Sequence, residues 1–99
     1  MAQCIRSGDT MHRHLFTVRF ANEMGAQDAR KQIRHLQLSE GRIESVTLRD
    51  RGNDGAEIQF HLVREKSRSR AVGINVSDLL KIMTFVDQCG GSIDGIVRK

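Results

Sequence analysis

The residues able to perform acid–base or metal chemistry are few and scattered along the chain. Its four histidines are His12, His14, His35 and His61. His12 and His14 alternate at the start of a predicted strand, so both imidazoles would project from one face, where they could hold zinc or copper. Either metal needs a third ligand, and none is evident beside them in the sequence. We therefore expect no metal site, and we interpret His35 and His61 as solvated or hydrogen-bonded side chains on the polar faces of a helix and the sheet.

Nucleophilic catalysis finds equally little support. Cys4 and Cys89 are far apart, fit no metal or redox spacing, and lack the basic or glycine-rich surroundings that activate a thiol. They would allow one disulfide, although a reduced cytosolic protein is the simpler interpretation. No serine lies in a nucleophile elbow, and Asp50, Asp54 and Glu57 lack the spacing of a calcium loop. The sequence therefore predicts a protein without a catalytic site, a cofactor or a bound metal.

Basic side chains form the densest charged feature. Residues 64–70 carry four cations, with Glu65 as the only acid, and the whole chain has a formal net charge of +4. Such a loop could contact phosphates or an anionic membrane leaflet, although a solvated connection is the simpler interpretation. The candidate contacts for an anion or a nucleic acid are Arg19, Arg64, Lys66, Arg68 and Arg70.

Composition favours one globular domain. The chain has 99 residues, of which 38% are hydrophobic and 28% charged, which is typical of a single folded domain. It has four Phe and no Trp, Tyr or Pro, so aliphatic residues must build most of the core. No stretch approaches the ~20 apolar residues of a membrane span, and the N-terminus lacks the apolar run of a secretory signal. We expect a cytoplasmic protein, or the cytosolic part of a membrane protein that reaches the membrane only through its parent chain.

Hydrophobic periodicity divides the chain into an arm and one domain. Residues 1–13 show no periodicity and are interpreted as a loose N-terminal arm, which leaves one domain at 14–99. Alternating apolar and polar residues predict strands at 14–20, 43–49, 57–62 and 93–97. Spacings of three and four predict amphipathic helices at 26–38 and from an N-cap at Asn75 or Ser77 to about Gln88. The connecting segments are a turn at 22–25, a hairpin loop at 50–55 and an exposed loop at 64–70.

This order of elements predicts an α+β fold. A β-α-β-β-α-β chain folds in a ferredoxin-like manner, with two helices on one face of a four-stranded antiparallel sheet. The predicted core consists of Phe16, Val18, Phe20, Ile33, Leu36, Val46, Leu48, Ile58, Phe60, Leu62, Leu79, Met83 and Val86. The opposite face would carry Thr17, Arg19, Gln59 and His61. A face this polar can be solvated, or it can pair with a ligand or another subunit.

Residues 14–97 resemble the ACT family of regulatory domains, which share this order of elements. The similarity is carried by FANEMG at 20–25, GRIESV at 41–46, DGAEIQFHL at 54–62, LL at 79–80 and GSIDGI at 91–96. The resemblance implies a ligand-responsive or dimerising module of an enzyme, transporter or regulator. ACT ligands, often amino acids, bind at the turn after the first strand, near a subunit interface. The resemblance implies that the corresponding ligand-binding residues in this chain are Asn22, Glu23, Met24 and Gly25. The usual Asp-x-Pro-Gly form of the turn is absent, because the chain has no proline.

Two further families are similar. The cytosolic domain of MgtC/SapB-type bacterial membrane proteins resembles this chain and has an ACT-like fold. RNA-recognition motifs share the topology, and LFTVRF at 15–20 resembles their first-strand motif. GAEIQF at 55–60 only half matches their third-strand motif, because Glu57, Gln59 and His61 take positions where aromatic rings would stack on bases. We therefore expect a regulatory or interaction module that forms a homodimer through the sheet or an edge strand, or binds a partner protein or small molecule. RNA binding is the alternative.

Overall fold

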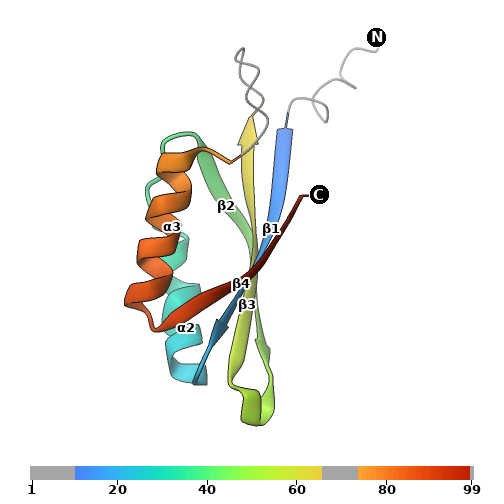
Figure 1. Ribbon diagram of the computed structural model, residues 1–99, viewed down its shortest axis with the longest axis vertical. Helices are drawn as coiled ribbons and strands as arrows, with labels where there is room; N and C mark the ends of the chain where they lie inside the picture. Colours follow the sequence, from blue (N-terminus) through green and yellow to red (C-terminus); the bar gives the residue numbers. More distant parts are fainter. Residues whose placement is uncertain (1–10, 66–73, 99) are drawn as a thin grey trace.

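The computed structural model describes residues 11–65 and 74–98 of the chain. Its elements are β1 (Met11–Phe20), α2 (Glu23–Ile33), β2 (Gly41–Asp50), a short 3-10 turn (Gly52–Asp54), β3 (Ala56–Glu65), α3 (Val76–Gln88) and β4 (Gly91–Arg98). The strands form one antiparallel sheet of order β2-β3-β1-β4, with both helices on one side of it (Figure 1). The predicted α+β class and element order are confirmed, and the strand order is consistent with a ferredoxin-like arrangement. Within the described ranges, neither helix has the length and hydrophobicity needed to cross a bilayer.

The two central strands carry the aromatic part of the core. β1 pairs with β3 so that Phe16 lies opposite Phe60, and their rings stack at 5.0 Å with an interplanar angle of 12°. Because side chains alternate along a strand, Val18 also faces the helices, while Thr17 and Gln59 face the open side of the sheet as predicted. The buried core consists of Phe16, Val18, Phe20, Ala26, Ala29, Ile33, Val46, Ala56, Ile58, Phe60, Leu62, Ile82 and Val86. Most of the predicted core is thereby confirmed, with Leu36, Leu48 and Leu79 partly buried against it.

A β-bulge sets the phase of β2. The register moves from Glu44 opposite His61 to Thr47 opposite Gln59, so two residues of β2 stand opposite one residue of β3. Ser45, with φ of +55°, takes the left-handed conformation at this point. Ile43 and Leu48 are five positions apart and would point to opposite faces of a regular strand; the extra residue allows both to pack against the core.

The helix boundaries differ from those predicted for α2. The Asn22 side chain accepts a hydrogen bond from the Gly25 N–H at 2.8 Å, so the predicted turn at 22–25 is in fact an N-cap and the first helical turn. The helix ends at Ile33 because the next N–H groups, from His35 and Leu36, bond three residues back and close a turn. The prediction that this helix reaches residue 38 is therefore wrong. α3 uses Asn75, one of its two predicted caps.

Three other expectations are corrected by the strands and by α3. β1 begins at Met11, so residues 11–13 belong to the sheet and not to a loose arm; residues 1–10 lie outside the described residues. β3 continues to Glu65, so Arg64 lies in a strand and not in an exposed loop. On α3 the residue that packs in the core is Ile82, whereas Met83 is 48% exposed. Ile82 and Val86 share a face at helical spacing, and Met83 lies about 100° around the helix from Ile82.

A buried carboxylate fastens α3 to the start of β2. Asp78 is 1% exposed and accepts hydrogen bonds from the N–H groups of Ser39, Glu40 and Gly41, at 2.5, 3.0 and 2.9 Å. Burial alone raises the pKa of Asp78, but the hydrogen bonds from Glu40, Ser39 and Gly41 outweigh it and hold that pKa below its usual range. The N-terminal end of α3 is therefore held against the sheet by a charged group (Figure 1).

Truncating Phe60 to Ala should lower the free energy of unfolding by about 3–5 kcal/mol, because it removes a stacked ring and leaves a cavity. Urea unfolding followed by circular dichroism measures this loss. Met24→Ala is the matched control, since Met24 is 74% exposed, and it should change stability by less than about 0.5 kcal/mol. Similar losses in the two variants would contradict the placement of Phe60 in the core.

Asp78→Asn should destabilise the protein by about 1.5–3 kcal/mol near neutral pH, because the amide cannot replace a carboxylate that accepts three N–H groups. The stabilisation from Asp78 is present above its unfolded pKa of 3.8 and is lost as pH falls through the lower pKa of the folded state. Unfolding measured from about pH 7 to about pH 3 should show the gap between parent and variant closing at the acid end. A difference in stability that does not depend on pH would contradict this prediction. The control is Asp28→Asn, because Asp28 lies on the exposed surface of α2.

Candidate functional site

Exposed apolar side chains gather on one helix and one edge strand. Among the described residues, every exposed large hydrophobic side chain except Met24 lies on α3 or β4. We call this set the α3–β4 surface: Val76, Leu80 and Met83 on α3, with Ile96 and Val97 on β4. The three α3 residues are spaced by four and three, so they form a stripe along the helix, separate from the face that packs on the sheet.

The stripe is continuous with an open strand edge. The order β2-β3-β1-β4 leaves one side of β4 unpaired within the described sheet. Between α3 and β4 runs a groove of about 380 Å³, lined by Met83, Val86, Asp87, Gly91, Ser92 and Ile93. Farther along β4, Ile96 stands opposite Phe16 and Val97 opposite Leu15, so apolar side chains lie on both faces of the edge. Unpaired N–H and C=O groups beside apolar side chains form a surface suited to adding a further strand.

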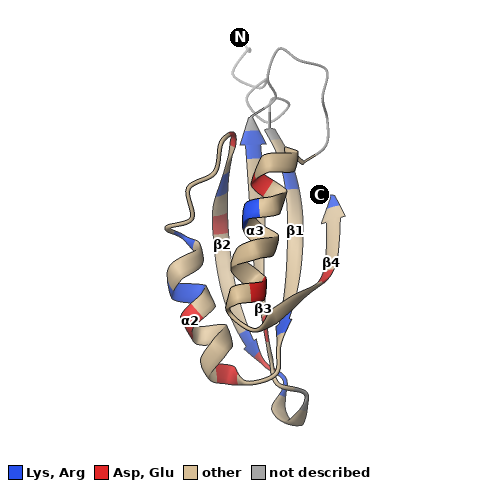
Figure 2. Ribbon diagram, turned by 60° about the vertical axis from the view of Figure 1, so that its left-hand side comes forward, with Lys and Arg blue, Asp and Glu red and all other residues tan. Residues whose placement is uncertain are grey.

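Exposed acids and bases are equal in number on the described parts of the two elements that carry the α3–β4 surface. These residues are Lys81, Asp87, Asp94 and Arg98, on a chain whose formal net charge is +4, and Figure 2 colours the charged positions along the ribbon. Lys81 points away from β4, because its Nζ donates to the Gln37 carbonyl oxygen at 3.0 Å. Asp94 lies 4.0 Å from Arg19 of the open face, a contact between half-exposed groups that contributes little energy. Little net repulsion therefore opposes the approach of another surface of the same kind.

The four residues suggested for ligand binding lie at the start of α2. Asn22 caps the helix, while Glu23 and Met24 are exposed. A Cβ on Gly25 would stand 3.2 Å from the backbone oxygen of Cys89, so glycine permits close packing of α2 against the end of α3. Gly25 is the one of the four that lines a groove of about 350 Å³ between the helices, together with Asp28, Gln32, Phe85, Gln88 and Cys89. Ligand binding at this turn stays a prediction.

The basic residues suggested for anion binding are not brought together. Arg19 lies on the open face near one end of β1, whereas Arg64 lies on the helix side, opposite His12 at the other end. Arg64 is only 8% exposed and forms an ion pair with Glu40, from its Nη2 to Oε1 at 2.9 Å. Lys66, Arg68 and Arg70 lie outside the described residues. These two arginines therefore cannot belong to one flat basic surface.

The open face of the described sheet carries no phenylalanine ring. Phe16, Phe20 and Phe60 are buried on the helix side, and the remaining Phe of the chain, Phe85, is on α3. Glu57 is nearly buried on the open face, where it forms an ion pair with Arg51 at 2.9 Å. A sheet that binds RNA presents several stacking rings at these positions, whereas the described strands offer only the imidazole of His61.

The groups considered for catalysis lie apart. His35 follows α2, His61 lies on the open face of β3, and Cys89 ends α3. Burial raises the pKa of the Cys89 thiol, and the nearby Asp28 carboxylate raises it further. Less thiolate is therefore present at neutral pH, which is opposite to the tuning of a nucleophilic cysteine.

Sequence reasoning missed the α3–β4 surface as a site. The segment 79–86 has six apolar residues, more than one buried helix face can use, and this excess was the available signal. Periodicity alone cannot decide which of two adjacent apolar residues faces outward.

Cys89 should react slowly with iodoacetamide at about pH 8, because its raised pKa lowers the thiolate fraction. Cys4→Ser leaves Cys89 as the single thiol of the two-cysteine chain, and mass spectrometry follows its alkylation. The same variant unfolded in urea is the control and should react faster. A folded protein that reacts faster than the unfolded chain would contradict the direction of the shift.

Comparison with known proteins gives no relative for this chain. No family model matches it. No curated protein and no solved structure matches it either. The resemblance to ACT domains therefore stays a prediction carried by the sequence segments quoted above.

Proposed function

We propose that this chain is a non-catalytic, ferredoxin-like interaction or regulatory module that works as a homodimer joined through the α3–β4 surface. One observation carries the proposal: an unpaired strand edge and an exposed apolar helix stripe lie side by side, sharing the groove between Met83 and Ile93. An edge strand left open in this way invites pairing with another strand. The apolar stripe would add buried area to that pairing.

A second copy of this chain is the occupant that fits best. In a two-fold dimer the same surface lies on both sides of the interface, so β4 would pair with β4 and the stripe of one α3 would pack beside the other. The mixed charges of Asp87, Asp94 and Arg98 on these two elements support association between copies despite the basic character of the whole chain. Nucleic acid would instead favour a surface of net positive charge.

The resemblance to ACT domains supports a regulatory role for such a dimer. In that family ligands bind near a subunit interface, and a small molecule held at the start of α2 would lie close to the end of α3. We place the module in the cytoplasm, either as a free protein or within a larger bacterial protein. Turnover is not expected, because His35, His61 and Cys89 lie on separate segments of the chain and burial raises the pKa of the Cys89 thiol.

Sedimentation equilibrium over a range of protein concentrations tests the dimer. Met83→Lys should weaken self-association at least about tenfold, because it places a charge in the apolar interface. Met24→Lys is the matched control: the same substitution at an exposed methionine on α2, which should leave the dissociation constant unchanged. Both side chains are exposed, so both variants should fold.

A parent protein that stays monomeric throughout would overturn the proposal, as would equal weakening by both lysine substitutions. Salt-sensitive binding of single-stranded RNA by a monomeric parent would also overturn it and favour the RNA-binding alternative.

A further inference from the structure

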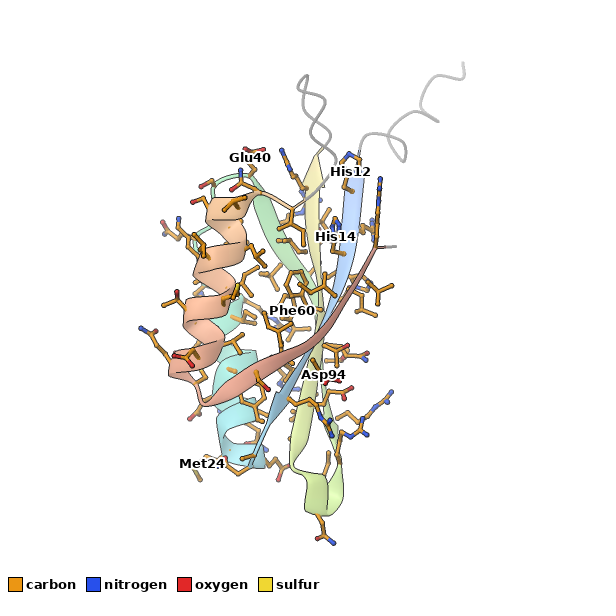
Figure 3. All side chains as sticks on the ribbon, in the orientation of Figure 1. His12, His14, Met24, Glu40, Phe60 and Asp94 are labelled. Atoms are coloured by element: carbon orange, nitrogen blue, oxygen red, sulfur yellow. The ribbon has the colours of Figure 1, made fainter. Side chains whose placement is uncertain are left out.

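Four basic side chains gather at one end of the helix-facing side of the sheet. His12 and His14 are two positions apart on β1, so they share a face, and Figure 3 shows them at the same end of that strand. His12 lies opposite Arg64 of β3, and His14 lies opposite Arg98 of β4. Residues directly opposite each other in an antiparallel pair have Cβ atoms about 5 Å apart. We call these four residues the His–Arg cluster.

Two described carboxylates near the His–Arg cluster, Glu40 and Asp78, are already engaged. Glu40 pairs with Arg64 at 2.9 Å and also accepts a hydrogen bond from the Asn75 side chain at 2.8 Å. Asp78 of α3 is occupied by three backbone N–H groups. Arg98 forms no ion pair with any residue in the described part of the chain. Among the side chains that the structure describes, positive charge in this cluster therefore exceeds the negative charge facing it.

One of the two imidazoles has a buried nitrogen without a partner, and the other is largely buried. His14 is only 9% exposed. The Nε2 atom of His12 is buried and has no hydrogen-bond partner in the structure. Buried polar atoms in native proteins nearly always find a partner, so the His12 nitrogen is available to donate to a water or to a bound anion. The pKa of His14 is lowered, mainly by burial and further by the positive charges of Arg98 and His12. This direction is expected where no negative charge lies nearby.

A metal ion does not fit this position. Two imidazoles on one strand could hold a divalent cation, but the two guanidinium groups beside them would repel it. Within residues 11–65 and 74–98, no group of three or more histidine, cysteine or carboxylate side chains is placed to hold a metal. An anion, in contrast, would accept hydrogen bonds from the imidazoles and balance the arginine charge.

We propose that the His–Arg cluster binds a phosphate group of a small ligand. A guanidinium group can donate two parallel hydrogen bonds to phosphate oxygens. Arg64 already pairs with Glu40, so the principal contact with phosphate is assigned to Arg98. His12 and His14 would donate to the remaining oxygens, and Arg64, held by Glu40, would add positive potential from the neighbouring strand. Inorganic phosphate and a phosphate monoester present the same chemistry to these groups. The site does not include the apolar stripe of α3, so phosphate titration tests it by a different measurement from the one that tests the proposed dimer.

Nuclear magnetic resonance of the histidine side chains in the full chain tests this site. Inorganic phosphate, added at constant ionic strength with chloride as the reference salt, should shift the His12 and His14 resonances along a saturable curve. The resonances of His35 and His61, which lie on other parts of the molecule, should stay in place. The pKa of His14 should rise when phosphate is bound, because the anion stabilises the imidazolium.

Arg98→Gln should weaken phosphate binding at least about tenfold. Arg13→Gln is the matched control: Arg13 stands between the two histidines on β1 but projects from the opposite face, so its loss of charge should leave the affinity unchanged. Both arginines are exposed, so neither variant should impair folding.

Glycerol phosphate distinguishes the two sources of the phosphate group. Tighter binding of the monoester than of inorganic phosphate would assign the site to a phosphorylated metabolite, and equal binding would assign it to the free anion. Either result supports the proposal. A non-saturating shift, equal weakening by Arg13→Gln and Arg98→Gln, or a response of both histidines to zinc but not to phosphate would overturn it.

Discussion

The stacking of Phe16 on Phe60 is the contact on which this arrangement depends. It joins the two central strands on the side that the helices cover, and it places the largest side chains of both strands in one buried layer. Because side chains alternate along a strand, this arrangement commits Thr17, Gln59 and His61 to the open face. The phenylalanine rings of the two central strands therefore lie in the core. None of them is on the open face, where RNA-binding sheets of this topology stack bases.

The helix α3 serves the core and an exposed surface at the same time. Asp78, Ile82 and Val86 face the sheet, while Val76, Leu80 and Met83 project elsewhere. The bonds from Asp78 to the start of β2 fix one end of the helix, so the exposed stripe keeps a defined position relative to β4. A preordered surface loses less conformational entropy on association than a mobile one, which favours binding through this face.

The sequence predicted the parts of the fold that follow from local pattern. Alternation around Phe16 and Phe60 predicted the central strands and most of the core, and Asn75 was one of two predicted caps. The bulge at Ser45 was missed because an irregular spacing of apolar residues does not reveal a left-handed residue. Met83 was placed in the core because Ile82 and Met83 are both apolar, and only the packed helix distinguishes them.

The His–Arg cluster shows why a site can escape sequence reasoning. Arg64 and Arg98 are far from His12 and His14 along the chain, and the pairing of β1 with β3 and β4 brings them together. Arg98 also ends the strand whose free edge carries Ile96 and Val97 in the α3–β4 surface. Pairing of that edge would order the end of β4, where the proposed phosphate contact lies. Linkage is reciprocal, so any effect of phosphate on dimerisation must equal the effect of dimerisation on phosphate affinity, and β4 is the element through which the two events would communicate.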